Sequence, residues 1–300
     1  MSPPPYGSRR ARPLDYPVGA LAWALVWLIR RLPVDWASAL GGALGRGLGP
    51  LSRAHRTARG NLQRMMPELD AATRRRVLRG MWDNLGRTAF EYPHLDAFAI
   101  DGPDPRIEVV GLEHATPRDG RLEVIYFSGH IGNWEILGLT AAQLGTPPTV
   151  IYRAANNPLT ERLLQKLRAP AAGRQLPKGA RSVRPLLQAA RDGETIALLV
   201  DQKMNDGMAV PFMGRPAMTA TMPAEFALRF GRPLLPAFAE RLGGARFRIT
   251  VLPPIRAEGS ERDRADVAAL LARMNAVLED WIRAHPEQWF WVHRRWPAED

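Results

Sequence analysis

The 300-residue chain contains no cysteine, which excludes disulfide bonds, thiolate metal sites and a cysteine nucleophile. Histidine is scarce, with six residues. Most are scattered, and none has the H-E-x-x-H spacing of a zinc enzyme, so we expect no metal and no other cofactor. The hydrolase pattern G-x-S-x-G and the phosphate-binding glycine patterns are also absent. The sequence therefore offers no evident covalent nucleophile and no nucleotide-binding loop.

Acidic residues are too few to balance the basic ones. Lysine and arginine number 41 against 30 aspartates and glutamates, a net charge of +11. Such a surplus favours anionic partners, which are nucleic acid, an acidic lipid surface or an acidic protein. No recognisable nucleic-acid motif accompanies the arginines, so we expect no nucleic-acid partner. Hydrophobic residues make up 46%, enough for a globular body with a sizeable core.

No apolar run is long enough to be an ordinary transmembrane helix. Residues 1–15 are basic and rich in proline, as in a flexible tail. The uncharged run 16–29 would cover about 21 Å as a helix, less than the ~30 Å hydrocarbon core. It could span with the help of Arg30 and Arg31, lie in the membrane interface with Trp23 and Trp27, or be a buried core helix. We expect residues 16–50 to be a membrane-associated helical segment that anchors the chain.

The rest of the chain alternates between apolar strand-like runs and helical patterns. Gly41, Gly45 and Gly49 are spaced four apart, which lets one helix approach another closely. The alternation predicts an α/β sheet with helices on its faces. Strands are expected at 123–128, 148–152, 195–200, 233–239 and 246–253, and helices at 70–92, 133–145, 157–168, 183–193, 223–231 and 264–286.

The stretch "YFSGHIGNWEIL" (126–137) ends a strand in a cluster of polar residues. Residues five apart in a continuous helix point about 140° apart, so His130 and Glu135 meet only if His130 lies on a turn and Glu135 in the first helical turn. Gly132 supplies a flexible backbone, and Asn133 could cap the helix. A carboxylate on one imidazole nitrogen leaves the other nitrogen as a base. The pattern predicts a His–Glu catalytic pair, although a lone histidine is more often structural.

The pattern H-x-x-x-x-E, which His130 and Glu135 form after a strand, resembles the motif of glycerolipid and lysophospholipid acyltransferases. "GHIGNWE" is similar to the late acyltransferases of lipid A biosynthesis, the lauroyl and myristoyl acyltransferase family. "RTARGNLQRMMPEL" (56–69), "LVDQK" (199–203), "VPFMGRPA" (210–217) and "PEQWFWVHRRW" (286–296) follow in family order. The resemblance implies a mixed, mostly parallel sheet flanked by helices, an acyltransferase domain over residues 51–300, and a location at the cell inner membrane with this domain on the cytoplasmic side.

The resemblance also implies roles for individual residues. The catalytic group comprises His130, Glu135, Arg168 and Asp201. The substrate-binding group comprises Gly132, Asn133, Trp134, Tyr152, Arg153, Gln202, Arg294 and Arg295. Arg294 and Arg295 are either structural or directed at phosphate, and Asp201 could instead be a helix cap or a partner of Arg168. The loop 168–179 is rich in alanine and proline where a polar loop is expected, so its contacts with the acceptor remain open.

The implied reaction transfers an acyl chain from a thioester of acyl carrier protein or coenzyme A to a hydroxyl of an anionic lipid acceptor, a Kdo-bearing lipid A precursor. His130 would be the base and Glu135 would stabilise its imidazolium. Backbone N–H groups at Gly132 and Asn133, or Arg168, would stabilise the oxyanion. Two alternatives stay open: an acyltransferase for another glycolipid or a lysophospholipid, and a non-catalytic membrane-binding protein.

Overall fold

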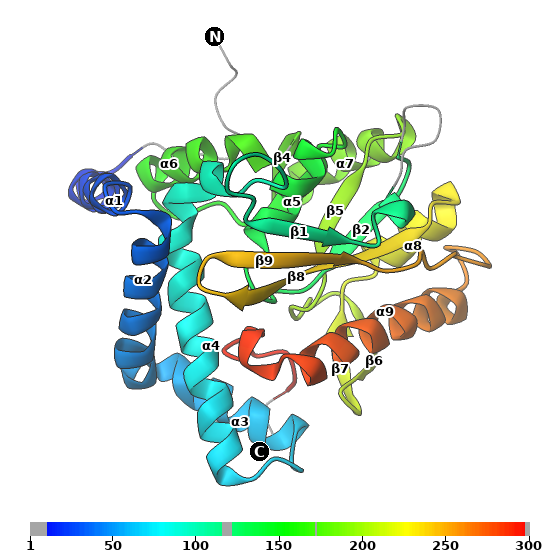
Figure 1. Cartoon of the computed structure of the whole chain (residues 1–300). Coiled ribbons are helices and arrows are strands. Elements are labelled where there is room, and N and C mark those ends of the chain that lie inside the picture. Colours follow the sequence, from blue (N-terminus) through cyan, green and yellow to red (C-terminus); the bar gives the residue numbers. More distant parts are fainter. Residues whose placement is uncertain (1–10, 116–121, 172, 298–300) are drawn as a thin grey trace.

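A computed structural model describes residues 11–115, 122–171 and 173–297. Most of the tail predicted for residues 1–15 lies outside the described residues. A group of helices at one end of the molecule precedes the sheet (Figure 1). Its members are α1 (Asp15–Ile29), α2 (Val34–Leu48), the 3₁₀ turn η1 (Gly49–Leu51), α3 (Arg53–Met65) and α4 (Ala71–Glu91).

Side-chain caps and close contacts fix these helices. The Asp70 carboxylate accepts a hydrogen bond from the Thr73 N–H at the start of α4, which satisfies a backbone donor that the helix leaves free. The predicted close approach of glycines is confirmed, because α2 and α4 lie side by side (Figure 1) and a Cβ on Gly41 or Gly45 would collide with the α4 backbone at Gly86 or Trp82.

The central sheet has seven strands in the order β1-β9-β8-β2-β5-β3-β4. All neighbouring pairs are parallel except β8 and β9, which confirms the predicted mixed, mostly parallel sheet. The strands are β1 (Ile107–Val110), β2 (Ile125–Ser128), β3 (Thr149–Tyr152), β4 (Arg174–Pro177), β5 (Ile196–Leu199), β8 (Leu234–Gly243) and β9 (Arg246–Val251).

Helices cover both faces of this sheet. α5, α6 and α7 lie on one side of it, and α9 lies on the other with the hairpin β6–β7 beyond it (Figure 1). Their bounds are α5 (Glu135–Gln143), α6 (Pro158–Arg168), α7 (Ala180–Arg191), α8 (Met222–Phe230), α9 (Arg264–Ala284), β6 (Met208–Phe212) and β7 (Arg215–Thr219). Short 3₁₀ turns are η2 (Tyr92–Ala97), η3 (Leu112–Ala115), η4 (Ala169–Ala171) and η5 (Pro286–Gln288).

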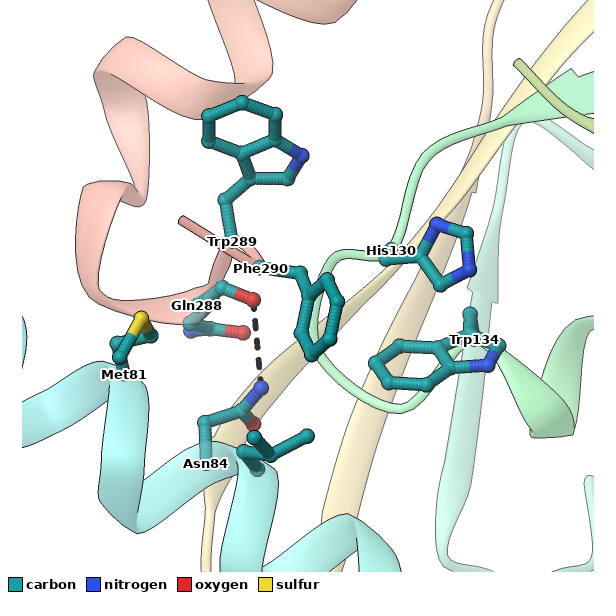
Figure 2. A pocket seen from close by; sticks show the side chains of 8 residues that line it. Met81, Asn84, His130, Trp134, Gln288, Trp289 and Phe290 are labelled. Carbon is teal, nitrogen blue, oxygen red and sulfur yellow. Dashed lines mark hydrogen bonds between the residues drawn. The ribbon is translucent and has the colours of Figure 1, made fainter. Parts of the chain in front are cut away.

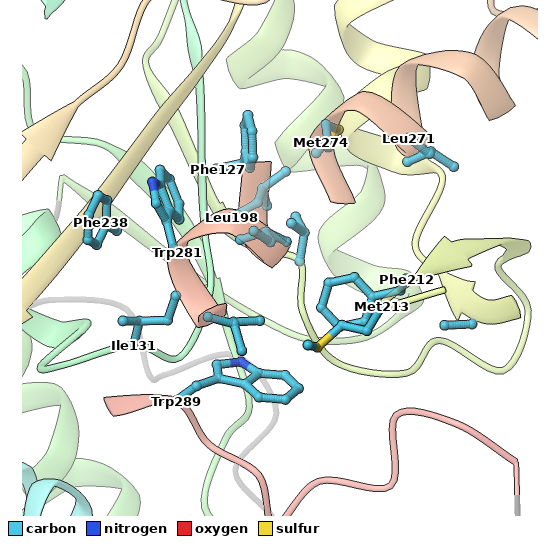
Figure 3. Packing of buried hydrophobic residues seen from close by; sticks show 14 of the residues in the cluster. Phe127, Ile131, Leu198, Phe212, Met213, Phe238, Leu271, Met274, Trp281 and Trp289 are labelled. Atoms are coloured by element: carbon cyan, nitrogen blue, oxygen red, sulfur yellow. The ribbon is translucent and has the colours of Figure 1, made fainter. Parts of the chain in front are cut away.

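The main core fills the space between the sheet, α9 and the hairpin (Figure 3). Phe127 of β2 and Leu198 of β5 meet Trp281 of α9 in this cluster, and Trp289 closes its lower edge. The aromatic rings of Phe238 and Trp281 have centroids 4.3 Å apart. Because Trp289 belongs to this core, the segment that follows α9 is held rigidly beside the end of β2.

The expected strands and helices occur near their predicted positions. β8 runs to Gly243, farther than predicted, and β1, β4 and the β6–β7 hairpin were not predicted. Part of the alanine- and proline-rich segment 168–179 forms the edge strand β4. An edge strand bonds to only one neighbour, so proline and exposed arginine are tolerated there.

None of the described helices has the length and apolar composition needed to cross a membrane. The predicted spanning form of residues 16–29 is therefore not supported. α1 instead packs on α6, where a Cβ on Gly19 would collide with Leu159. The Arg30 guanidinium donates to the Pro93 carbonyl and the Asp96 carboxylate, each at 2.7 Å, and so ties the end of α1 to the body.

Candidate active site

Two neighbouring parallel strands end together at the candidate site. Ser128 at the end of β2 is in register with Leu199 at the end of β5, so the next residues, Gly129–His130 and Asp201, emerge at the same edge of the sheet. A Cβ on Gly129 would lie 3.2 Å from an Asp201 carboxylate oxygen. Glycine at this position lets the turn with His130 approach the carboxylate closely, where open α/β sheets commonly place ligand-binding residues.

Asp201 holds His130 through both its oxygens. The His130 Nδ1 lies 2.7 Å from Asp201 Oδ1, and the His130 backbone N–H donates to Oδ2 at 2.8 Å. The indole Nε1–H of Trp289 donates to the same Oδ2 at 2.8 Å. Because a carboxylate only accepts hydrogen bonds, the proton of a neutral His130 ring resides on Nδ1. Nε2 then carries the lone pair and can accept a proton.

The electrostatics of this pair favour the charged imidazolium. Burial opposes that charge, but the facing Asp201 and, more weakly, Glu135 outweigh it and raise the pKa of His130 above its usual 6.5. Burial also opposes the Asp201 charge, yet His130 and the donors around the carboxylate lower the pKa of Asp201 to about 2. The His130 side chain remains 16% exposed, so the ring is not sealed inside the protein.

The predicted hydrogen bond between His130 and Glu135 is wrong, since no bond joins them among the described residues. Glu135 is the first residue of α5, and its carboxylate faces Arg168 at the end of α6. Arg168 Nε donates to Glu135 Oε2 at 3.0 Å and Nη2 donates to Oε1 at 2.8 Å. The position next to the imidazole is taken by Asp201. The alternative pairing of Asp201 with Arg168 is therefore also wrong.

Arg168 sits between two aromatic rings. Its guanidinium carbon lies 5.3 Å from the Tyr92 ring centroid and 5.6 Å from that of Tyr152, distances typical of cation–π contacts. Burial is the largest single effect and opposes its charge, but the hydrogen bond and charge of Glu135, with the weaker effects of Tyr92 and Glu161, together outweigh it and raise the pKa of Arg168. Glu135 and Arg168 thus form a second fixed ion pair beside the first.

The free side of His130 faces an exposed amide and an aromatic hollow. Gln202 Nε2 lies 3.3 Å from His130 Nε2. Trp134 and Phe290 flank the imidazole, with ring centroids 4.9 and 5.8 Å from it (Figure 2). A shallow hollow lies beside them, lined also by Met81, Asn84 and Leu85 of α4 and too tight for a water molecule. A proton acceptor therefore opens onto a small, mainly apolar space.

A buried polar network that was not predicted from the sequence fixes the turn between His130 and Glu135. The Gly132 carbonyl accepts from Asn84 Nδ2 at 2.9 Å and from Thr88 Oγ1 at 3.2 Å. Glu91, which is fully buried, accepts from Asn133 Nδ2 at 2.9 Å and pairs with Arg241. Asn84, Thr88 and Glu91 recur at helical spacing on α4, a polar stripe visible in the sequence.

The backbone of the same turn is less available than predicted. Gly132 has a φ of +57°, and a Cβ there would collide with the Ala239 carbonyl, so this position requires glycine. Its N–H donates to the Gln288 carbonyl at 3.0 Å, which corrects the prediction that it stabilises an oxyanion. Asn133 is fully buried, and its Oδ1 accepts from the Glu135 N–H at 3.2 Å, so it does cap the start of α5.

The remaining predicted residues divide into buried and exposed ones. Tyr152 is buried, and its hydroxyl donates to Glu161 at 2.7 Å. Arg295 is fully buried, and its Nη2 donates to Thr219 Oγ1 at 2.6 Å. Burial lowers the pKa of Arg295 to about 10. Of its two predicted roles, structural or directed at phosphate, these surroundings fit the structural one. Arg153 and Arg294 are exposed and able to meet an anionic ligand.

The described residues contain no cluster of histidine, aspartate and glutamate that could hold a metal ion. The chemistry available at the site is thus proton transfer by an imidazole oriented by a buried carboxylate, beside an ion pair and an apolar hollow. In an α/β fold with mostly parallel strands, this arrangement could activate a hydroxyl without a protein nucleophile.

Comparison with known proteins identifies the family. Residues 7–298 match the model of the bacterial lipid A biosynthesis acyltransferases. The chain is 27% identical over 289 residues to "Lipid A biosynthesis lauroyltransferase" of Escherichia coli (strain K12), covering 92% of this chain and 90% of that protein. It is 26% identical over 288 residues to "Lipid A biosynthesis palmitoleoyltransferase" of the same organism, with the same coverage. "Phosphatidylinositol mannoside acyltransferase" of Mycobacterium tuberculosis (strain ATCC 25618 / H37Rv) is 25% identical over 178 residues, covering 57% of this chain and 53% of that protein.

The chain belongs to the bacterial lipid A biosynthesis acyltransferase family, and it is an acyltransferase.

Proposed function

We propose that this enzyme transfers a fatty acyl chain from an acyl thioester to a hydroxyl of a lipid A precursor, with His130 as the general base. The observation that carries the proposal is the His130–Asp201 pair, which fixes the ring with Nε2 toward the exposed amide of Gln202. The family supplies the reaction class and the lipid A acceptor. No covalent acyl-enzyme is needed, because the substrate hydroxyl itself is the nucleophile.

The proposed step conserves protons and electron pairs. Nε2 of His130 takes the proton of the acceptor hydroxyl while its oxygen attacks the thioester carbonyl carbon. Asp201 stabilises the imidazolium without taking its proton. The tetrahedral intermediate then collapses, the carbon–sulfur bond breaks, and the thiolate receives the proton from Nε2. Gln202, which lies 3.3 Å from Nε2, is our candidate donor to the developing oxyanion.

The Glu135–Arg168 pair would influence the electrostatic field at His130 and the shape of the site. Its carboxylate contributes to the raised pKa of His130, and Trp134 Nε1 donates to Glu135 Oε1 at 3.2 Å. Trp134 in turn flanks the imidazole. We therefore assign Glu135 a positioning role through Arg168 and Trp134, and not the hydrogen bond to His130 that the motif first suggests.

The size of the hollow limits what it could hold. It is too tight for a water molecule and so lies far below the ~300–1,000 Å³ of pockets that enclose a ligand. We therefore propose that both lipids lie over the adjoining surface and that only their reacting groups reach His130 at the edge of the hollow. The exposed guanidinium groups of Arg153 and Arg294 would meet the anionic groups of the acceptor there.

Membrane association would come from the N-terminal segment 16–50 lying in the interface. Trp23 of α1 is 41% exposed, Trp27 55% and Trp36 of α2 71%, an unusual concentration of apolar surface for a soluble body. The Arg31 guanidinium stacks at 3.9 Å over Trp27. Aromatic rings beside arginines suit the lipid–water boundary. We propose that residues 51–300 form the catalytic domain, on the cytoplasmic side of the inner membrane.

The donor carrier and the exact acceptor are separate questions. The net charge of +11 suits an anionic donor, and both acyl carrier protein, which is acidic, and coenzyme A, which carries phosphates, meet that condition. Transfer onto another glycolipid is a second candidate, supported by the partial match to the mycobacterial mannoside acyltransferase.

One experiment separates these functions. The purified enzyme is given acyl carrier protein or coenzyme A thioesters with a Kdo-bearing lipid A precursor or a mannosylated phosphatidylinositol, and products are identified by mass spectrometry. We expect an added acyl chain on the lipid A precursor with carrier-protein thioester. Acylation of the mannolipid alone would replace the proposed acceptor, and no product with any pair would refute the function.

A further inference from the structure

A second, larger cavity lies away from His130, between α2, α3 and α4. It has a volume of about 640 Å³, within the range of pockets that enclose a ligand. Four arginines line it, together with a histidine and a tryptophan: Arg46, Arg59, Arg75, Arg79, His55 and Trp82. Among the described residues that line the cavity, none carries a carboxylate.

Three of these guanidinium groups have no acidic partner in the part of the chain that the structure describes. Arg46 pairs with Asp83, but Arg59, Arg75 and Arg79 are exposed and form no ion pair with a described residue. Like charges that gather around one concave surface repel each other, and an anion bound among them would remove that repulsion. The cavity is thus suited to a negatively charged group.

The histidine adds an oriented donor. The Trp82 indole Nε1–H donates to His55 Nδ1 at 3.0 Å, so the proton of a neutral imidazole is on Nε2. Burial and the nearby Arg59 lower the pKa of His55, which keeps the ring neutral near pH 7. His55 Nε2 and the guanidinium groups are all hydrogen-bond donors, and phosphate oxygens are the matching acceptors.

Three exposed leucines follow residues of the cavity lining in the sequence. Leu44 and Leu48 of α2 and Leu51 after it are 41%, 61% and 81% exposed. Each directly follows in sequence a residue that lines the cavity, namely Ala43, Gly47 or Pro50. A ligand with its anionic group in the cavity could therefore lay hydrocarbon chains along the leucines. Soluble phosphates would leave these leucines uncovered.

We propose that the cavity is a binding site for the phosphate headgroup of an anionic lipid, whose acyl chains lie along Leu44, Leu48 and Leu51. The lipid is not the reacting acceptor, because α4 presents Met81, Asn84 and Leu85 to the hollow beside His130, and a different set of residues to this cavity. The site would orient the enzyme on an anionic bilayer. It extends the proposed function and does not depend on which lipid is acylated.

The first test compares two variants with the same change in net charge. The site variant replaces Arg59, Arg75 and Arg79 with Gln, and the control variant replaces the exposed Arg256, Arg262 and Arg264 with Gln. Binding is measured by co-sedimentation with phosphatidylcholine vesicles, with and without phosphatidylglycerol. At about fivefold per arginine, the site variant should bind anionic vesicles roughly 100-fold more weakly, and the control less than threefold. Equal losses in both variants would overturn the proposal.

The second test separates a lipid from free phosphate. Calorimetric titration with a short-chain phosphatidylglycerol and with inorganic phosphate should give at least about tenfold tighter binding of the lipid, since its chains cover the leucines. Replacing Leu48 and Leu51 with Ser should weaken only the lipid. Equal affinity for both ligands, insensitive to these serines, would show a free-phosphate site and overturn the lipid assignment.

The third measurement separates this site from catalysis. Acyl transfer by the arginine variant is assayed in detergent with the substrate pair that the wild-type enzyme uses, and its thermal unfolding is compared with that of the wild type. We expect transfer within about twofold of wild type. A large loss in detergent by a variant with unchanged unfolding would mean that the cavity serves the reaction itself, which contradicts a separate anchoring site.

Discussion

The two ends of the segment 130–135 differ in how they are held. His130 lies on a turn after a strand, and its partner Asp201 follows the neighbouring strand. Glu135 begins a helix, and its partner Arg168 ends another helix on the outer layer. The first pair therefore depends on the register of β2 and β5, and the second on where α5 begins relative to the end of α6. Residues that are close in sequence thus belong to two separate ion pairs, one suited to proton transfer and one to positioning.

Removing the base should have the largest effect. His130→Ala leaves no positioned acceptor for the hydroxyl proton, so we expect kcat/KM to fall by roughly 10³–10⁴. The Glu135–Arg168 pair is untouched, but the buried Asp201 charge loses the imidazole, so thermal unfolding is measured alongside to separate lost stability from the lost base. The measurement is a steady-state transfer assay on purified protein. Near-normal transfer by this variant would remove His130 from the mechanism.

The next effect tests the acid that orients the base. Asp201→Asn preserves the shape but favours the wrong ring tautomer, so we expect a loss of about 10³. Since the base must be neutral, wild-type kcat/KM should rise with pH through a pKa above 6.5. Without the Asp201 charge, burial dominates and the pKa of His130 falls, so the acid limb moves to lower pH. A pH–rate profile measures both effects, and a shift to higher pH would contradict them.

The second ion pair is tested by a double-mutant cycle. Glu135→Gln leaves the Arg168 charge unpaired, and Arg168→Gln leaves that of Glu135 unpaired, so each should lower transfer by about 10²–10³. The double variant should lose no more than either single one, because the two act as a unit. If the loss in the double variant equals the product of the two single losses, Glu135 and Arg168 act independently.

Gln202 should have a smaller effect. Removing one oxyanion donor commonly costs 10²–10³ in rate, and we expect about 10² for Gln202→Ala because water can reach this exposed position. The loss should appear in kcat with little change in KM. An effect on KM alone would assign Gln202 to substrate binding without a role in the intermediate.

The smallest effect concerns the N-terminal helices. Replacing Trp23 and Trp27 with Ser should weaken vesicle binding by about tenfold, since both rings would leave the interface. The control is Leu242→Ser, which removes an apolar side chain that is 47% exposed on β8, away from these helices. Equal losses of vesicle binding in the two variants would show that α1 is not the surface that contacts the membrane.

Sequence periodicity predicted most of the sheet and its helices, because buried apolar runs and helical spacing are local signals. It did not predict β1, β4 or the β6–β7 hairpin, which are short strands or lie outside the apolar runs. His130, Asp201 and Arg168 were identified from the motifs and the family resemblance, but their pairing was not. Whether Asp201 or Glu135 faces the imidazole depends on strand order, and a single sequence does not state that order.

The supporting residues were missed for the same reason. Trp289 donates to Asp201, and Arg241 pairs with Glu91 behind the turn. Each contact joins segments far apart in the chain. The buried Glu91 is locally indistinguishable from an exposed helical glutamate, and only the polar stripe of Asn84, Thr88 and Glu91 on an otherwise apolar face of α4 could have indicated the network.

The most direct test of the His130–Asp201 assignment is ¹⁵N NMR of the His130 ring in the wild type, Asp201→Asn and Glu135→Gln proteins. We predict a neutral ring protonated on Nδ1 in the wild type and in Glu135→Gln, and loss of that tautomer in Asp201→Asn. A tautomer that survives in Asp201→Asn but changes in Glu135→Gln would contradict the account and return Glu135 to the place beside the base.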